Sequence, residues 1–68
     1  MRLADSTWTD VRDVEAELAL LPVGSTEQHG PHAPLGLDWM TAEAIATEGA
    51  DRYAAEHDTA VPVGPTVP

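Results

Sequence analysis

The sequence has no cysteine and no lysine among its 68 residues. Without cysteine, the chain can form neither a disulfide nor a zinc site with thiolate ligands. A chain this short buries only about 60% of the surface that its unfolded form exposes, so small domains usually need a disulfide, a metal ion or a partner. The remaining sources of stabilisation for this chain are a partner and a metal ion with ligands other than cysteine.

Basic residues are scarce, because acidic residues outnumber them by 12 to 3 and the formal net charge is -9. Binding to nucleic acid or to an anionic membrane surface requires clustered Lys and Arg, so we expect neither partner. The acidic residues are spread along the chain rather than gathered in one tail. This spread indicates a solvated acidic surface that resembles those of proteins adapted to high internal salt, where screening removes self-repulsion.

Long apolar segments are also missing. The longest apolar run, from Leu18 to Val23, is far too short to span a bilayer. The opening stretch MRLADSTWTD has acidic residues where a signal peptide needs an apolar segment. We therefore expect a cytoplasmic protein.

Turn residues and apolar periodicity predict a short helix followed by a strand and a loop. Capping residues and an acid-rich first turn favour a helix at 9–14. The continuous apolar run ELALLPV at 17–23 predicts a strand buried on both faces, and its proline argues against a buried helix. The density of Gly and Pro at 24–38 predicts a loop.

The second half of the chain predicts an amphipathic helix at 39–57 and a short strand at 59–63. The apolar stripe of this helix is mostly small, so Gly49 is expected to allow close packing. The stripe comprises Ala42, Ile45, Ala46, Gly49, Ala50, Tyr53 and Ala54. The order strand, helix, strand predicts a βαβ unit with parallel strands. Two strands and one helix do not complete such a sheet, so residues 1–68 are expected to be part of a larger α/β domain or to need a partner.

The loop GSTEQHGPHAPLGLD at 24–38 leaves the carboxyl end of the first predicted strand, where α/β sheets bind ligands. In an extended segment, Glu27 and His29 point to the same side with Cα atoms about 6.6 Å apart. They could then reach two metal ions about 3.5 to 4 Å apart. Asp38 begins the next helix and could bridge them. Two structural alternatives stay open at this point, namely Asp38 as a helix N-cap and a His29 ring that donates to a backbone carbonyl.

Other polar and aromatic residues have structural interpretations. His57, in the last turn of the predicted helix, is expected to complement the helix dipole, with a pH-sensitive role as the alternative. Trp39 is expected to be a packing anchor, with a pocket wall as the alternative. Trp8 and Tyr53 are assigned to packing.

The segment LPVGSTEQHGPHAPLGLD resembles the signature loop of the creatininase family, and the resemblance continues through the helix to PTVP. This family comprises metal-dependent amidohydrolases. The resemblance implies a three-layer α/β/α domain with a mainly parallel sheet, of which residues 1–68 are the incomplete N-terminal part. It also implies a homo-oligomer, often a hexamer, that acts on a small-molecule amide.

The resemblance further implies a binuclear centre of divalent Zn, Mn or Fe ions. Glu27 and His29 would each bind one ion, and Asp38 would bridge both. A water or hydroxide between the ions would attack an amide carbonyl, cyclic amides included. His32 falls on a recurrent histidine of the motif and is expected to line the site or support a ligand. The remaining ligands, a histidine and an acid, would lie outside this chain.

The substrate is left open at this point. Ala33 and Leu37 depart from the family pattern, and members of the family hydrolyse creatinine, hydrolyse formamides in archaeal riboflavin and deazaflavin synthesis, or trim a peptide in redox-cofactor maturation. A different hypothesis is that the chain is a truncated, non-catalytic fragment that binds metal weakly or not at all.

The acidic composition generates a first prediction. If the surface is adapted to salt, the chain unfolds in dilute buffer and refolds at molar salt, because screening removes the repulsion among its acidic side chains. Far-UV circular dichroism along a salt titration measures this. A helical signal that does not change with salt would contradict the hypothesis.

Overall fold

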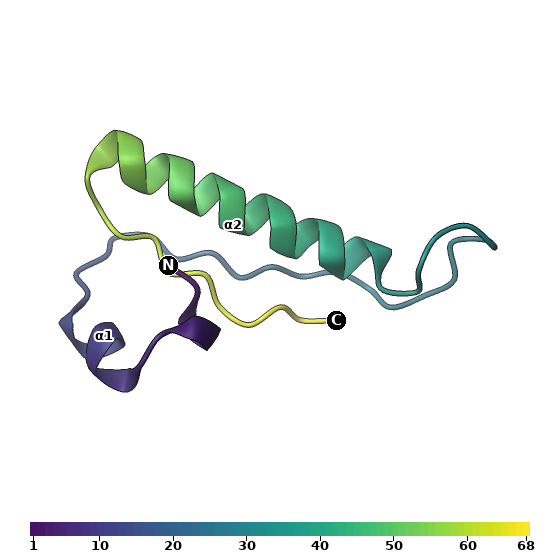
Figure 1. Ribbon diagram of the computed structural model, residues 1–68, viewed down its shortest axis with the longest axis horizontal. Helices are drawn as coiled ribbons and strands as arrows, with labels where there is room; N and C mark the ends of the chain where they lie inside the picture. Colours follow the sequence, from purple (N-terminus) through teal and green to yellow (C-terminus); the bar gives the residue numbers. More distant parts are fainter.

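The computed structural model describes residues 1–68 and shows one long helix lying along extended segments (Figure 1). The elements are a 3₁₀ helix η1 (Leu3–Asp5), a short helix α1 (Trp8–Asp13) and a long helix α2 (Leu37–His57). The molecule is elongated, at 44 × 25 × 15 Å. Helix α1 and the loop that precedes α2 lie at opposite ends of it (Figure 1). Neither α1 nor α2 combines the length and the apolar character that crossing a bilayer requires.

Helix α1 confirms the short helix expected near residues 9–14. Thr7 caps it through a capping box: the Thr7 hydroxyl oxygen accepts from the Asp10 N–H at 3.2 Å, and Asp10 Oδ2 accepts from the Thr7 N–H at 2.9 Å. Hydrogen bonding of the Asp10 carboxylate with the Thr7 backbone N–H, and next with the Thr7 side chain, holds the pKa of Asp10 below its ordinary value. The assignment of Trp8 to packing is wrong, since this residue is 75% exposed, with the Arg12 guanidinium 5.2 Å from its ring centroid.

Three extended segments lie beside one another and are joined by parallel bridges. Residues 61–67 run between the N-terminal residues and the segment at 20–24, with bridges Arg2 to Val63, Leu20 to Val63 and Val23 to Val67. The Leu3 N–H donates to the Val63 carbonyl at 2.9 Å, and the Gly64 N–H donates to the Leu20 carbonyl at 2.8 Å. The bridges have the parallel direction that the sequence predicted, whereas the pairing of the first residues was not expected.

The strands predicted at 17–23 and 59–63 do not form as continuous strands. Pro22, Pro62 and Pro65 have no N–H to donate, so the ladder of hydrogen bonds is interrupted. The register also shifts by one residue, because one segment advances three residues from position 20 to 23 while the other advances four from 63 to 67. Burial on both faces is wrong as well, since Leu21 is 61% exposed and Val23 is 62% exposed.

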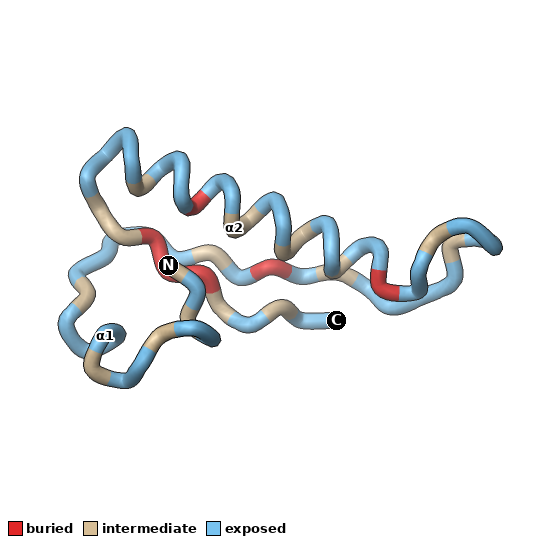
Figure 2. The backbone as a smooth tube through the Cα atoms, in the orientation of Figure 1, coloured by how far each residue is buried: buried red, intermediate tan, exposed pale blue.

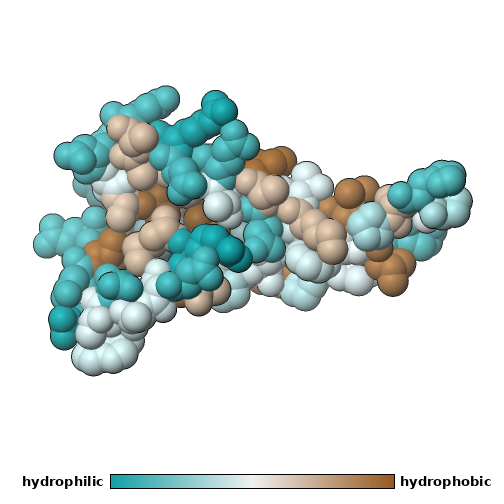
Figure 3. Space-filling view, viewed as in Figure 1, coloured by the Kyte–Doolittle hydropathy of each residue, from teal (hydrophilic) through white to brown (hydrophobic).

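The core is small and joins α2 to the segment at 61–67. It consists of Ala50, Val61 and Val63, with Leu20 and Ala46 packed against them and partly buried. Only 6 of the 68 residues are buried, which Figure 2 shows as short red stretches in a mostly exposed tube. Each buried valine contributes about 1.5 to 3 kcal/mol, so this core stabilises the chain only modestly. Apolar side chains accordingly reach the surface as brown patches among teal ones (Figure 3).

Helix α2 confirms the long helix and begins two residues earlier than the expected Trp39. Its covered face is shifted from the predicted stripe. Ala50 is buried, and Ala42, Glu43, Ala46, Thr47 and Ala54 are partly buried. Ile45 is 66% exposed, and a Cβ added to Gly49 would meet no atom within 4 Å. The close packing expected at Gly49 is therefore absent from this chain.

The glycines generate a prediction for stability, because Gly24 has the close contact that Gly49 lacks. A Cβ at Gly24 would lie 2.6 Å from the carbonyl carbon of Asp38, which is backbone and cannot turn away. Gly24→Ala is therefore expected to lower the urea midpoint of unfolding, whereas the control Gly49→Ala is expected to raise stability by about 0.5 to 1 kcal/mol. Circular dichroism measures both. A Gly24→Ala chain as stable as the wild type would contradict this packing.

Candidate metal centre

The structure brings together the three residues that the sequence singled out as metal ligands. Glu27, His29 and Asp38 each offer one ligand atom, and these atoms lie within 4.8 Å of one another. Glu27 and His29 come from the loop before α2, and Asp38 comes from the first turn of that helix. The cluster lies at the end of the molecule where this loop turns back into α2 (Figure 1).

Backbone contacts hold the loop in place. The Glu27 N–H donates to the Leu35 carbonyl at 3.0 Å, and this hydrogen bond joins the first part of the loop to its last part. Just after His29, Gly30 has a φ of 81°, a conformation that glycine adopts without steric cost, and its N–H donates to Gln28 Oε1 at 2.9 Å. The loop therefore turns at a fixed point beyond His29.

Asp38 lies in the first turn of α2, because the helix begins at Leu37. Gly36 is the N-cap residue, and no side chain caps the helix there, so the interpretation of Asp38 as an N-cap is wrong. A Cβ at Gly36 would lie 2.6 Å from Cε2 of Trp39, so the indole covers this glycine and Trp39 is a packing anchor, as predicted. Asp38 stands in the first turn, where the positive end of the helix dipole attracts negative charge.

Hydrogen bonding within the cluster leaves one nitrogen unpaired. The Ser25 hydroxyl lies 2.8 Å from Asp38 Oδ2 and 3.2 Å from Glu27 Oε1. His29 Nε2 lies 3.7 Å from Asp38 Oδ2, which is too long for a hydrogen bond, and this nitrogen is buried without any partner. Neither ring nitrogen of His29 forms a hydrogen bond, so the alternative in which the ring donates to a backbone carbonyl is wrong.

The donor set fits a divalent cation. A buried polar atom without a partner is costly, and a metal ion is one group that pairs with an imidazole lone pair beside carboxylates. Imidazole and carboxylate ligands suit zinc, manganese and iron. Three ligand residues are enough to hold one ion with open positions and too few to complete the coordination of two.

The other two histidines lie outside the cluster. His32 is exposed near the turn of the loop and forms no hydrogen bond. The His57 ring stacks on Tyr53 with centroids 4.0 Å apart, and its Nδ1 lies 3.1 Å from the Tyr53 carbonyl oxygen. This contact in the last turn of α2 supports the structural interpretation of His57.

Ser25 is the residue of this cluster that the sequence reasoning missed. Ser25 stands two positions before Glu27, and Glu27 stands two positions before His29. In an extended segment all three side chains therefore point to the same side. That spacing was the signal that could have found it.

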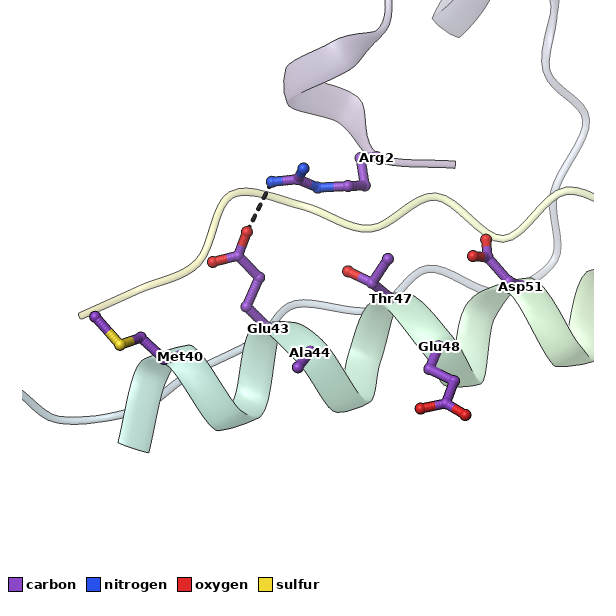
Figure 4. Close-up of a pocket in the computed structure, with 7 residues that line it drawn as sticks. All are labelled: Arg2, Met40, Glu43, Ala44, Thr47, Glu48 and Asp51. Atoms are coloured by element: carbon purple, nitrogen blue, oxygen red, sulfur yellow. Dashed lines mark hydrogen bonds and ion pairs between the residues drawn. The ribbon is translucent and has the colours of Figure 1, made fainter. Parts of the chain in front are cut away.

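A separate groove of about 470 Å³ runs along α2 beside the N-terminal residues (Figure 4). The Arg2 guanidinium donates to Glu43 Oε1 at 2.7 Å across it. None of its lining residues belongs to the cluster; they are Arg2, Met40, Glu43, Ala44, Thr47, Glu48 and Asp51. The groove is thus not a pocket of the candidate metal centre.

Comparison with known proteins identifies relatives along most of the chain. The family described as "Creatininase: Creatinine amidohydrolase" matches residues 4–68. The mycofactocin precursor peptide peptidase of Mycolicibacterium smegmatis is 46% identical over 50 residues, which are 74% of this chain and 20% of that protein. The peptidase of the same name from Mycobacterium ulcerans is 45% identical over 47 residues, 69% of this chain and 16% of that protein.

The matched segment is thus no more than about a fifth of the length of these curated relatives. No solved structure matches the chain. The loop that carries Glu27, His29 and Asp38 lies inside the matched residues, as does all of α2. The chain therefore belongs to the creatininase family of amidohydrolases.

Proposed function

We propose that this chain supplies part of the metal centre of an amide-bond hydrolase, with Glu27, His29 and Asp38 as ligands of divalent ions. The observation that carries the proposal is the buried His29 Nε2, which has no hydrogen-bond partner and lies beside two carboxylates. Membership of an amidohydrolase family supports the same chemistry. Zinc, manganese and iron all suit these ligands.

The residues of this chain have distinct roles in the proposed site. Glu27 and His29 would each bind one of two ions, and Asp38 would bind both through its two carboxylate oxygens. Bound divalent ions supply Lewis acidity, which acidifies a water molecule and polarises an amide carbonyl. The Asp38 side chain is 44% exposed, so further ligands and a substrate have access to it.

The names of the relatives favour a peptide as the substrate. Both proteins compared above are called peptidases of a precursor peptide, and their identity to this chain is 45% to 46%. We therefore place a peptide amide bond ahead of creatinine and of the formamides. The proposal includes the three-layer α/β/α domain and the homo-oligomer that the family resemblance implies.

A second candidate concerns residues 1–68 by themselves. The cluster contains only three ligand residues, and two of them are exposed. We therefore propose that these residues alone bind one ion weakly and hydrolyse no amide. A longer protein that contains them would bind the ions tightly and hydrolyse the amide. Because metal binding and folding are coupled, the isolated chain should gain helix when the ion binds.

Asp38→Asn tests the metal ligand without a change of shape. The asparagine amide lacks the negative charge that binds a cation. Loss of a group that supports a metal ligand lowers metal affinity by roughly 10- to 100-fold, so we expect loss of a ligand to lower zinc affinity by more than that. The control is Asp51→Asn, an exposed aspartate of the same helix outside the cluster. Competition with a chromophoric chelator measures both affinities. Equal affinities for Asp38→Asn and Asp51→Asn would contradict the site.

Activity is tested in a longer protein that contains residues 1–68. Glu27→Ala is expected to remove bound metal and to abolish amide hydrolysis, whereas Glu56→Ala, an exposed change at the other end of α2, is expected to keep both. Assays with a peptide, creatinine and a formamide separate the substrate classes. Metal content and hydrolysis that survive Glu27→Ala would rule out the proposed role, and cleavage of creatinine but not of the peptide would rule out the substrate.

A further inference from the structure

We propose that Ser25 is a positioning residue of the metal centre, which holds the Asp38 carboxylate beside Glu27 and His29 before an ion binds. This inference rests on the proposed function, because it concerns the same three ligands. Ser25 is not among the metal ligands, since its hydroxyl acts on them through hydrogen bonds.

The Ser25 hydroxyl joins two segments that are distant in the sequence. It lies 2.8 Å from Asp38 Oδ2, 13 residues away, and 3.2 Å from Glu27 Oε1. A hydroxyl has a single hydrogen to donate, so the shorter distance assigns that hydrogen mainly to Asp38. Hydrogen bonds to a carboxylate are roughly twice as strong as those between neutral groups.

The two carboxylates need such a donor because their charges repel. One oxygen of each lies within the 4.8 Å cluster, and no Arg side chain forms an ion pair with either of them. Their side chains are exposed, so without the hydroxyl Asp38 could turn toward water. By donating its hydrogen to Asp38, the Ser25 hydroxyl keeps this carboxylate beside Glu27 despite the repulsion, with Asp38 Oδ2 3.7 Å from His29 Nε2.

The hydrogen-bond partners of Ser25 indicate that it positions the proposed ligands rather than supports the loop. A serine that only supports a turn or a helix terminus bonds to backbone N–H or carbonyl groups. Both partners of the Ser25 hydroxyl are carboxylates of the cluster. The loop itself is closed elsewhere, by the hydrogen bond between Glu27 and Leu35. Removal of the hydroxyl should therefore change the ligands and leave the backbone in place.

The test titrates the full 68-residue chain with Co²⁺ alone and follows its visible absorption bands, which report the ligand field. We expect Ser25→Ala to weaken Co²⁺ binding by about 10- to 100-fold, the usual cost of losing a group that supports metal ligands. Ser25→Thr keeps a hydroxyl and should restore binding. The control is Thr26→Ala, an exposed neighbour whose side chain forms no hydrogen bond. Far-UV circular dichroism of every variant checks that α2 is intact.

The outcomes distinguish failure of the Ser25 assignment from failure of the metal site. Wild-type binding that Ser25→Ala weakens and Ser25→Thr restores, with helix content unchanged, supports the assignment. Equal Co²⁺ affinity and spectra for Ser25→Ala and the wild type would overturn it while leaving the metal site standing. A loss that Ser25→Thr does not restore would also overturn it, because the hydroxyl would then not be the cause. A wild-type chain that binds no Co²⁺ contradicts the proposed one-ion site of residues 1–68 and the role of Ser25 together.

Discussion

The close approach of Gly24 to the backbone at the start of α2 is the contact on which the candidate site depends. The space beside Gly24 is filled by the backbone of Asp38 and Trp39, so no larger residue fits there without moving the helix. This contact sets the beginning of the loop directly against its end. Glu27 and His29 meet Asp38 of α2 for this reason, although nine or more positions separate them from it in the sequence.

The rest of the fold supports the site only lightly. Three buried residues form the core, and several large apolar side chains remain exposed, among them Leu21, Val23 and Ile45. The chain matches no more than about a fifth of the length of its curated relatives, all of which are much longer. A small core combined with a locally closed loop means that the cluster of Glu27, His29 and Asp38 depends on short-range contacts more than on the overall packing of these residues.

The sequence predicted the helices and the proximity of Glu27, His29 and Asp38, because both depend on local patterns. The start of α1 follows from the capping residue Thr7, whereas α2 begins two residues before the predicted Trp39 because Gly36, which has no capping side chain, is its N-cap. The meeting of Glu27, His29 and Asp38 follows from a turn-rich loop. The strands were harder, since Pro22 and Pro62 read as parts of apolar runs while their missing N–H groups interrupt the pairing. The hydrogen-bond partners of Ser25 needed atomic positions, because a hydroxyl two residues before Glu27 has many possible partners.

The most direct test of the central claim is ¹⁵N NMR of the histidine side chains during addition of Zn²⁺. The chain has three histidines, and the structure places only His29 in the cluster, with His32 exposed and His57 stacked on Tyr53. The account predicts that the Nε2 resonance of His29 shifts to a metal-bound position while those of His32 and His57 do not move. Equal shifts of all three histidines, or no shift of His29, would contradict it.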